Sequence, residues 1–197
     1  EGADPNKSSV TPTATRGVWK YDPVNDLWDD KKMGDFNVRA VAVKGSYVFA
    51  GTAGTGPMPA GRVFRSTNGG NTWNSGVTLG ATTIVRAIRV RTDNNIFAAT
   101  DDGVFLSTDD GVSFNSVWIT SVPPDNNVLS FAIVPTIQST MYAGTSASLY
   151  KSANSGTSWA LSDNGIGRMP VSSVAVNGSN IWTTSQQYSL VGRYTGG

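Results

Sequence analysis

Short runs of alternating apolar and polar residues recur along the chain and predict β-strands. Four such runs are each followed, after a few polar residues, by a second apolar run. This two-residue period is typical of strands with one buried face, and no window shows the 3.6-residue period of a helix. The sequence therefore predicts an all-β fold. The candidate first strands are residues 38–43, 85–90, 128–133 and 171–176, and the candidate second strands are 47–51, 95–100, 140–145 and 180–185.

Three of the second strands contain nearly the same phrase, an aromatic residue followed by two small residues and a threonine. Small side chains after the aromatic residue permit neighbouring sheets to approach closely. Because the phrase recurs, we interpret the sheets as copies of one unit. The three phrases are Phe49-Ala50-Gly51-Thr52, Phe97-Ala98-Ala99-Thr100 and Tyr142-Ala143-Gly144-Thr145.

Candidate third strands follow at residues 62–65, 104–106, 148–151 and 190–194. The first three lead into a repeated eight-residue turn, here called a box, which connects each of them to a fourth strand. The boxes begin 41 and 45 residues apart, a period that suits one four-stranded propeller blade. The sequence therefore predicts a β-propeller of four-stranded antiparallel blades, with about four blades in this chain. The shared box positions are Ser66, Asn68, Gly70 and Trp73; Ser107, Asp109, Gly111 and Phe114; and Ser152, Asn154, Gly156 and Trp159.

Two parts of the chain fall outside the regular repeat. Residues 1–15 are polar, contain two prolines and are predicted to form an extended tail before a propeller of residues 16–197. Residues 17–30 resemble a third strand, a turn and a fourth strand whose aromatic residue is Trp28. This segment could complete the last blade, but one third strand is then surplus. A closed four-bladed ring, an open arc completed by a second chain and a fragment of a longer propeller all remain open. The expected blades are 38–75, 85–117, 128–162 and 171–197, plus 17–30.

The residue types of the boxes are those of a folding device. The Asp or Asn side chain is expected to accept hydrogen bonds from amides of the turn, and the glycine to adopt a positive φ. The aromatic residue is expected to fill the gap between neighbouring blades, where its burial contributes roughly 2 to 3 kcal/mol.

The pattern S-x-D-x-G-x-[ST]-W resembles the Asp-box, or BNR repeat, of sialidases, sortilin-type receptors, xyloglucan-cleaving glycosidases and photosystem II assembly propellers. The resemblance covers residues 16–197, and Asn replaces Asp in two of the three boxes. In that family the boxes lie on the rim opposite the binding face. The resemblance therefore implies a fold and leaves the activity open.

Composition removes several classes of function. The 197 residues carry a net charge of +1, and 15% of them are charged, so neither a nucleic-acid surface nor a membrane anchor is indicated. Cysteine and histidine are absent and glutamate occurs only as Glu1, so we expect no zinc or copper site and no cofactor. Asp29, Asp30 and Asp35 could coordinate calcium, but we interpret them as part of a solvated charged loop. A start at Glu1 without methionine is expected of an exported, processed protein in the extracellular space or periplasm.

The family resemblance implies a ligand face built by loops between fourth and first strands and between second and third strands. Arg39 and Arg86 hold the same position in consecutive first strands, where two guanidinium groups could bind a carboxylate or sulfate. The alternative is that each caps a neighbouring carbonyl or pairs with Asp35 or Asp125. Further ligand candidates lie in the loops themselves, and they are Met58, Trp118, Arg168 and Tyr188.

These features favour a non-enzymatic exported propeller that binds a protein or a glycan. We expect it to form a homo-oligomer, to bind no nucleic acid and to have no membrane span. Glycoside hydrolysis usually requires a pair of carboxylates about 5 to 9.5 Å apart, and only aspartates are available here. Two alternatives stay open. One is a structural subunit of an extracellular assembly that uses its N-terminal tail, and the other is an excised part of a sialidase-like or other glycoside hydrolase propeller.

Overall fold

The structure is a computed structural model that describes residues 16–30, 33, 36–54, 58–118, 125–185 and 191–195. In these ranges the regular secondary structure is entirely β, which confirms the predicted fold class. The described part of the chain contains no helix of the length and apolar character needed to cross a membrane. The tail predicted at residues 1–15 lies outside the described residues.

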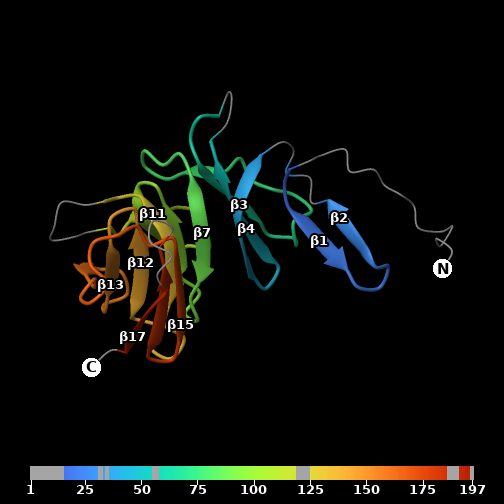
Figure 1. Cartoon of the computed structure of the whole chain (residues 1–197). Helices are drawn as coiled ribbons and strands as arrows, with labels where there is room; N and C mark the ends of the chain where they lie inside the picture. Colours follow the sequence, from blue (N-terminus) through green and yellow to red (C-terminus); the bar gives the residue numbers. More distant parts are fainter. Residues whose placement is uncertain are drawn as a thin grey trace.

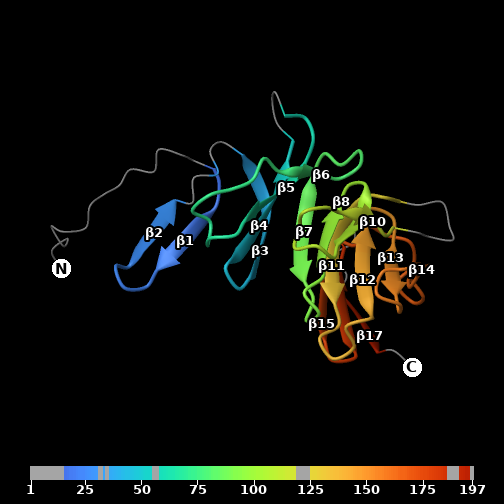
Figure 2. The ribbon, with the colours of Figure 1, turned by 180° about the vertical axis from the view of Figure 1, so that it is seen from behind.

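The strands form five antiparallel sheets in chain order (Figures 1 and 2). Three of these sheets have four strands. The first contains β3 (Asn37–Lys44), β4 (Tyr47–Ala53), β5 (Arg62–Ser66) and β6 (Val77–Thr78). The second contains β7 (Val85–Val90), β8 (Ile96–Thr100), β9 (Gly103–Ser107) and β10 (Asn115–Ser116). The third contains β11 (Val128–Ile133), β12 (Met141–Thr145), β13 (Leu149–Ser152) and β14 (Ala160–Leu161).

Two smaller sheets lie at the ends of the array. A hairpin of β1 (Trp19–Asp22) and β2 (Leu27–Asp30) precedes the first four-stranded sheet. A three-stranded sheet of β15 (Ser173–Asn177), β16 (Asn180–Thr184) and β17 (Val191–Thr195) follows the third. The five sheets stand side by side along an arc, with β1–β2 at one end and β15–β17 at the other (Figure 1).

The core lies between neighbouring sheets. Phe49, Ile88 and Phe105 belong to one buried cluster between the first and second four-stranded sheets. Phe97, Phe131 and Trp159 belong to the next cluster, between the second and third. A third cluster joins the last four-stranded sheet to β15–β17 and contains Tyr142, Leu149, Val171 and Ile181. The second and third four-stranded sheets therefore have a buried cluster on each face.

Small residues of the repeated phrase set the distance between sheets. A Cβ atom added at Gly51 would lie 2.5 Å from the Cγ1 atom of Val85 in the next sheet. At Gly144 it would lie 2.5 Å from the carbonyl oxygen of Val171. Larger side chains at these two positions would force the sheets apart.

The boxes form the turns between third and fourth strands through one hydrogen-bond pattern. In the second box the Gly111 N–H donates to Ser107 Oγ over 2.8 Å, and Ser107 Oγ donates to Asp109 Oδ1 over 2.8 Å. The Ser113 N–H also donates to Asp109 Oδ1, over 2.9 Å. The same bonds recur in the first box (Ser66, Asn68, Gly70, Thr72) and in the third (Ser152, Asn154, Gly156, Ser158). The three box glycines have φ values of +89°, +79° and +85°, as predicted.

Asp and Asn use their second side-chain atom differently. Asp109 Oδ2 accepts a hydrogen bond from the Ser113 hydroxyl over 2.6 Å, whereas Asn154 Nδ2 donates to Ser158 Oγ over 2.9 Å. Because a hydroxyl can donate or accept, either residue completes the turn. The hydroxyl and N–H of Ser113 lower the pKa of the Asp109 carboxyl to about 2.

The box aromatics pack toward the preceding sheet. Trp159 is buried, and its Nε1–H donates to the Val117 carbonyl oxygen over 2.9 Å. Phe114 and Trp73 are half-buried against the clusters on the corresponding side of their own sheets. Trp28 differs from them, because 66% of its surface is exposed and its ring contacts Tyr21 of the same hairpin.

Two sequence expectations need correction. In the last sheet the first strand begins at Ser173 instead of Val171. The Val171 N–H donates to the Thr145 carbonyl oxygen, and the Val171 side chain packs into the third cluster, so this residue precedes the strand. The segment around Trp28 also does not complete the last sheet. Strands β1 and β2 pair with each other at the opposite end of the arc, so the described chain does not form a closed four-bladed ring.

Candidate functional site

Loops around the third four-stranded sheet bring together two of the predicted ligand residues, Trp118 and Arg168, with several polar groups. Trp118 follows β10, Asp125 precedes β11, Ser146 lies between β12 and β13, Tyr150 lies in β13 and Arg168 follows β14. These five residues are called the Trp118 cluster below. The four residues other than Tyr150 lie in loops that connect fourth to first strands or second to third strands, so they lie at one end of the sheets.

Trp118 is positioned by close packing. Its ring centroid lies 5.2 Å from that of Tyr150, at an interplanar angle of 65°, and 5.1 Å from that of Trp159. Gly103 lies beneath it with φ +96°, and an added Cβ there would lie 2.6 Å from Trp118 Cβ. The glycine therefore leaves space for the half-buried indole.

Asp125 and Ser146 link two loops. The Ser146 hydroxyl donates to Asp125 Oδ2 over 2.7 Å, and the Asn127 N–H donates to Asp125 Oδ1 over 3.1 Å. The Ser146 N–H donates to the Asn127 carbonyl oxygen over 3.1 Å. These bonds hold the carboxylate at the same loop end as the aromatic pair.

Charges of both signs act on Tyr150. Burial raises the pKa of its hydroxyl, the negative charge of Asp125 raises it further, and the positive charge of Arg168 opposes both. Asp163 raises the same pKa more weakly, while its own Oδ2 accepts a hydrogen bond from the Ser148 hydroxyl over 2.9 Å. Arg168 is exposed, so its guanidinium is available to a ligand.

Three buried polar atoms around the cluster have no hydrogen-bond partner within the part of the chain that the structure describes. They are Trp118 Nε1, Asn126 Oδ1 and Arg86 Nε. Native proteins leave few buried polar atoms unpaired. Three further atoms of this kind belong to arginines elsewhere in the described chain, namely Arg62, Arg65 and Arg91.

The other predicted residues are dispersed. Arg39 and Arg86 do hold equivalent positions, each at an irregularity in the pairing of its first strand with the second. Arg39 is exposed, whereas Arg86 donates from its NH2 group to Asn127 Oδ1 over 2.9 Å. Met58 is half-buried on the loop before β5, and Tyr188 lies outside the described residues. The structure thus joins Trp118 and Arg168 around Tyr150 and gives the two arginines different neighbours.

Sequence reasoning missed Tyr150 and treated Asp125 only as a partner for arginine. A signal for Tyr150 was present, because the same third-strand position holds Phe64 and Phe105 in the other four-stranded sheets. A hydroxyl that occurs in one copy of a repeat, at a position that is otherwise purely apolar, marks that copy as different. No comparable pattern distinguishes Asp125 from the other loop aspartates.

The arrangement is suited to binding. The loop end combines a half-buried indole with a carboxylate, a hydroxyl and an exposed guanidinium, so it offers apolar surface together with donors and acceptors. Within the described residues, no group of three or more acidic side chains could hold a metal ion.

Comparison with known proteins supports the fold. The family model described as "DUF6242 beta propeller domain" matches residues 18–197. No curated protein matches the sequence significantly.

Several solved structures share the architecture at low identity. A GH74 xyloglucanase from Xanthomonas campestris aligns with a TM-score of 0.67 and 17% identity over 90% of this chain and 34% of its own. The extracellular domain described as part of a hybrid two-component system of B. thetaiotaomicron aligns with a TM-score of 0.69 and 15% identity, over 92% of this chain and 24% of its own. A computationally designed protein, Ika4, aligns with a TM-score of 0.59 and 12% identity, over 84% of this chain and 95% of its own. The chain thus spans about a third of the xyloglucanase and a quarter of the extracellular domain.

Proposed function

The chain belongs to the family of DUF6242 beta propeller domains, and we propose that it is a non-enzymatic, exported interaction module that binds a glycan through the Trp118 cluster. A protein segment is the second class of ligand, and the experiment below separates the two. The single observation that carries the proposal is the junction of a half-buried indole with Asp125 and the exposed Arg168 at one loop end.

A glycan fits this surface for a chemical reason. Sugar rings present an apolar face of C–H groups and a rim of hydroxyls that both donate and accept hydrogen bonds. The indole face of Trp118 suits the former, and Asp125, Ser146 and Arg168 suit the latter. A solved neighbour acts on xyloglucan by its name and another is extracellular by its name, which supports both a sugar ligand and an exported location.

The non-enzymatic part of the proposal rests on the available groups. Histidine and cysteine are absent from the sequence, and Glu1 is its only glutamate. Asp125 and Asp163 at the site are already held by hydroxyls of neighbouring loops. The alternative, that the chain is a piece of a larger glycoside hydrolase, is favoured by its likeness to about a third of a xyloglucanase.

We further propose that the three boxes are Asp-boxes of the BNR type. The support is their common network, in which a serine hydroxyl accepts from the glycine N–H and donates to Asp or Asn. This network lies at the turns between third and fourth strands, away from the Trp118 cluster. The boxes therefore have a structural role in this proposal.

The test is a glycan array followed by calorimetric titration of the best ligand. We expect selective binding by the wild type and at least about a tenfold loss of affinity in Arg168→Ala, since a charge-assisted hydrogen bond contributes about 1.5 to 3 kcal/mol. Trp118→Phe, which keeps an aromatic ring, should weaken binding less than Trp118→Ala.

Trp28→Ala is the matched control, because it removes the same side chain from an exposed hairpin at the other end of the arc. It should leave affinity unchanged. If the wild type binds no glycan on the array, the glycan proposal is refuted and a protein ligand becomes the candidate. Release of reducing sugar by the wild type would refute the non-enzymatic assignment.

A further inference from the structure

The first four-stranded sheet leaves part of one apolar face uncovered, although the same face is buried in the next two sheets. Val41 pairs with Ala50 as Ile88 pairs with Ala98 and Phe131 with Ala143, so the three first-strand residues are equivalent. Ile88 and Phe131 are 1% and 2% exposed, because the preceding sheet covers them. Val41 is 48% exposed, and Val43 on the same strand is 61% exposed. The face that normally receives a preceding blade is open here.

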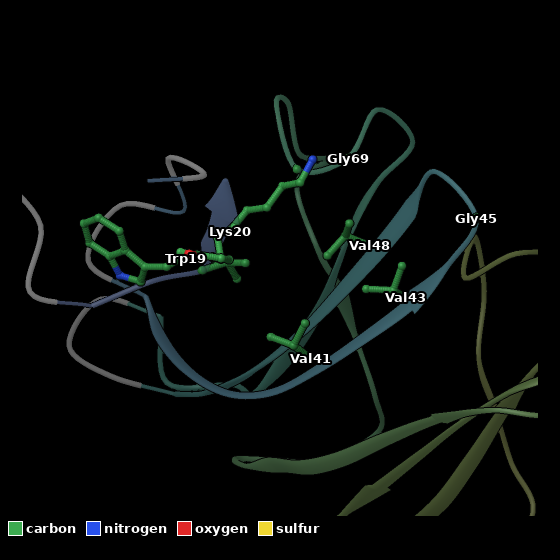
Figure 3. Close-up of a pocket in the computed structure, with 10 residues that line it drawn as sticks. Trp19, Lys20, Val41, Val43, Gly45, Val48 and Gly69 are labelled. Atoms are coloured by element: carbon green, nitrogen blue, oxygen red, sulfur yellow. The ribbon is translucent and has the colours of Figure 1, made fainter. Parts of the chain in front are cut away.

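This face forms one wall of a groove beside β1 (Figure 3). Its volume is about 340 Å³, and Val41, Val43 and Val48 line the wall formed by β3 and β4. The opposite wall is β1, from which Lys20 extends toward Gly69. Among the described strands β1 pairs only with β2, so its other edge is open for strand addition.

The hairpin β1–β2 already holds the outer half of a preceding blade. Val18, just before β1, packs with Ala50 and Phe64 of the first sheet. The positions over β3 remain without a covering strand. What the groove lacks is therefore the inner pair of strands, which in every four-stranded sheet of this chain is a hairpin of first and second strands.

The other end of the arc presents such a hairpin with an uncovered face. Ala175 of β15 pairs with Trp182 of β16, as Ala42 pairs with Phe49 and Ala132 with Tyr142. Phe49 and Tyr142 are buried, and in the described part no sheet follows β15–β17 to cover the equivalent residues. Ala175 is exposed and Trp182 is half-buried.

We propose that the groove binds the β15–β16 hairpin of a second copy of this chain. The joint sheet then has the order β15, β16, β1, β2 and is a complete blade between the third sheet of one copy and the first sheet of the next. Trp182 and Ala175 of one copy cover Val41 and Val43 of the other, which continues the interface that already repeats within the chain.

The arrangement involves an exchange of one strand. In the separate chain β17 pairs with β16 over five residues and occupies the third place in that sheet. In the assembly β1 of the neighbouring copy takes this place. The contact is heterologous, with one face of each copy against the opposite face of another, so it produces rings or open chains.

Sedimentation velocity on the full chain over a range of concentrations tests the proposal. The wild type should exceed the mass of one chain as concentration rises. Val43→Asp removes the acceptor face and Ala175→Asp removes the donor face, because each places a charge in an apolar contact. Each variant alone should associate at least about tenfold more weakly than the wild type, which corresponds to 1.4 kcal/mol.

Mixing the two variants provides the decisive outcome. Each retains one intact face, so the mixture should form a complex of two chains and nothing larger. Val112→Asp is the matched control, since Val112 is 56% exposed on the second box, and it should associate like the wild type. Thermal unfolding should show that all three variants are folded.

The proposal is refuted if the wild type keeps the mass of one chain at every concentration. It is equally refuted if Val43→Asp and Ala175→Asp associate as strongly as Val112→Asp, or if their mixture stays monomeric while the wild type assembles.

Discussion

At the scale of single residues, the boxes depend on glycines at positions where any side chain would be strained or would clash. Gly111 has φ +79°, and an added Cβ would lie 2.7 Å from Cε1 of the fully buried Phe49. Gly45 has φ +58° but no atom within 4 Å of its added Cβ. Comparing Gly45 with Gly111 therefore separates the conformational cost of a positive φ from the cost of a steric clash.

We expect Gly45→Ala to lower the free energy of unfolding by about 1 kcal/mol, the cost of a positive φ in a residue with a side chain. Gly111→Ala should lose about 2 to 4 kcal/mol, because overpacking adds to that cost. Urea denaturation of both variants measures the difference. Equal losses would show that Phe49 moves aside freely.

Asp109 gives the second box a dependence on pH that the asparagine boxes lack. Its pKa in the folded protein is about 2, against about 3.9 for an unfolded chain. The stabilisation is thus fully present above pH 4 and is lost as pH falls toward 2. We expect the stability advantage of the wild type over Asp109→Asn to shrink between pH 4 and pH 2. Denaturation curves at pH 5, 4, 3 and 2 measure it, and a constant difference would contradict the assigned hydrogen bonds.

At the scale of elements, the threonine that ends each repeated phrase ties a second strand to the loop that follows. Thr100 is fully buried, its Oγ1 accepts the Asp102 N–H over 2.9 Å, and it donates to the Gly103 carbonyl oxygen over 2.9 Å. Thr145 makes the corresponding bonds to Ala147 and Ser148. The loop face is thereby anchored to the sheets by buried hydroxyls.

Replacing this hydroxyl by a methyl group should be costly although the shape is kept. We expect Thr100→Val to lose about 1 to 3 kcal/mol of unfolding free energy, because buried backbone groups lose their partner. Thr67→Val, at an exposed turn position, should change it by less than about 0.5 kcal/mol. Similar values for the two variants in urea denaturation would contradict the anchoring role.

The elements also show how far the sequence alone could lead. Alternation and the repeated phrase located the first and second strands, because the second strands of the four-stranded sheets are almost fully buried and the first strands are buried in part. The fourth strands β6, β10 and β14 have only two residues each, too few for a pattern to define them. The site was predicted only in part, since the approach of Trp118, Asp125 and Tyr150 depends on how two sheets stand beside each other.

At the scale of the whole molecule, the repeat is continuous but its ends differ. The inner faces of the arc are covered by neighbouring sheets, whereas Val41 and Val43 at one end and Ala175 at the other are exposed. The Trp118 cluster lies beside two complete four-stranded sheets, away from both ends of the arc. A ligand site there would not depend on what covers the ends.

Ligand titration observed through the indole N–H resonances of the six tryptophans tests the central claim most directly. The signal of Trp118, assigned by its disappearance in Trp118→Phe, should shift progressively as a glycan selected on the array is added, while the Trp28 signal stays in place. Shifts confined to Trp19 or Trp28, with Trp118 unchanged at saturation, would contradict a binding site at the Trp118 cluster.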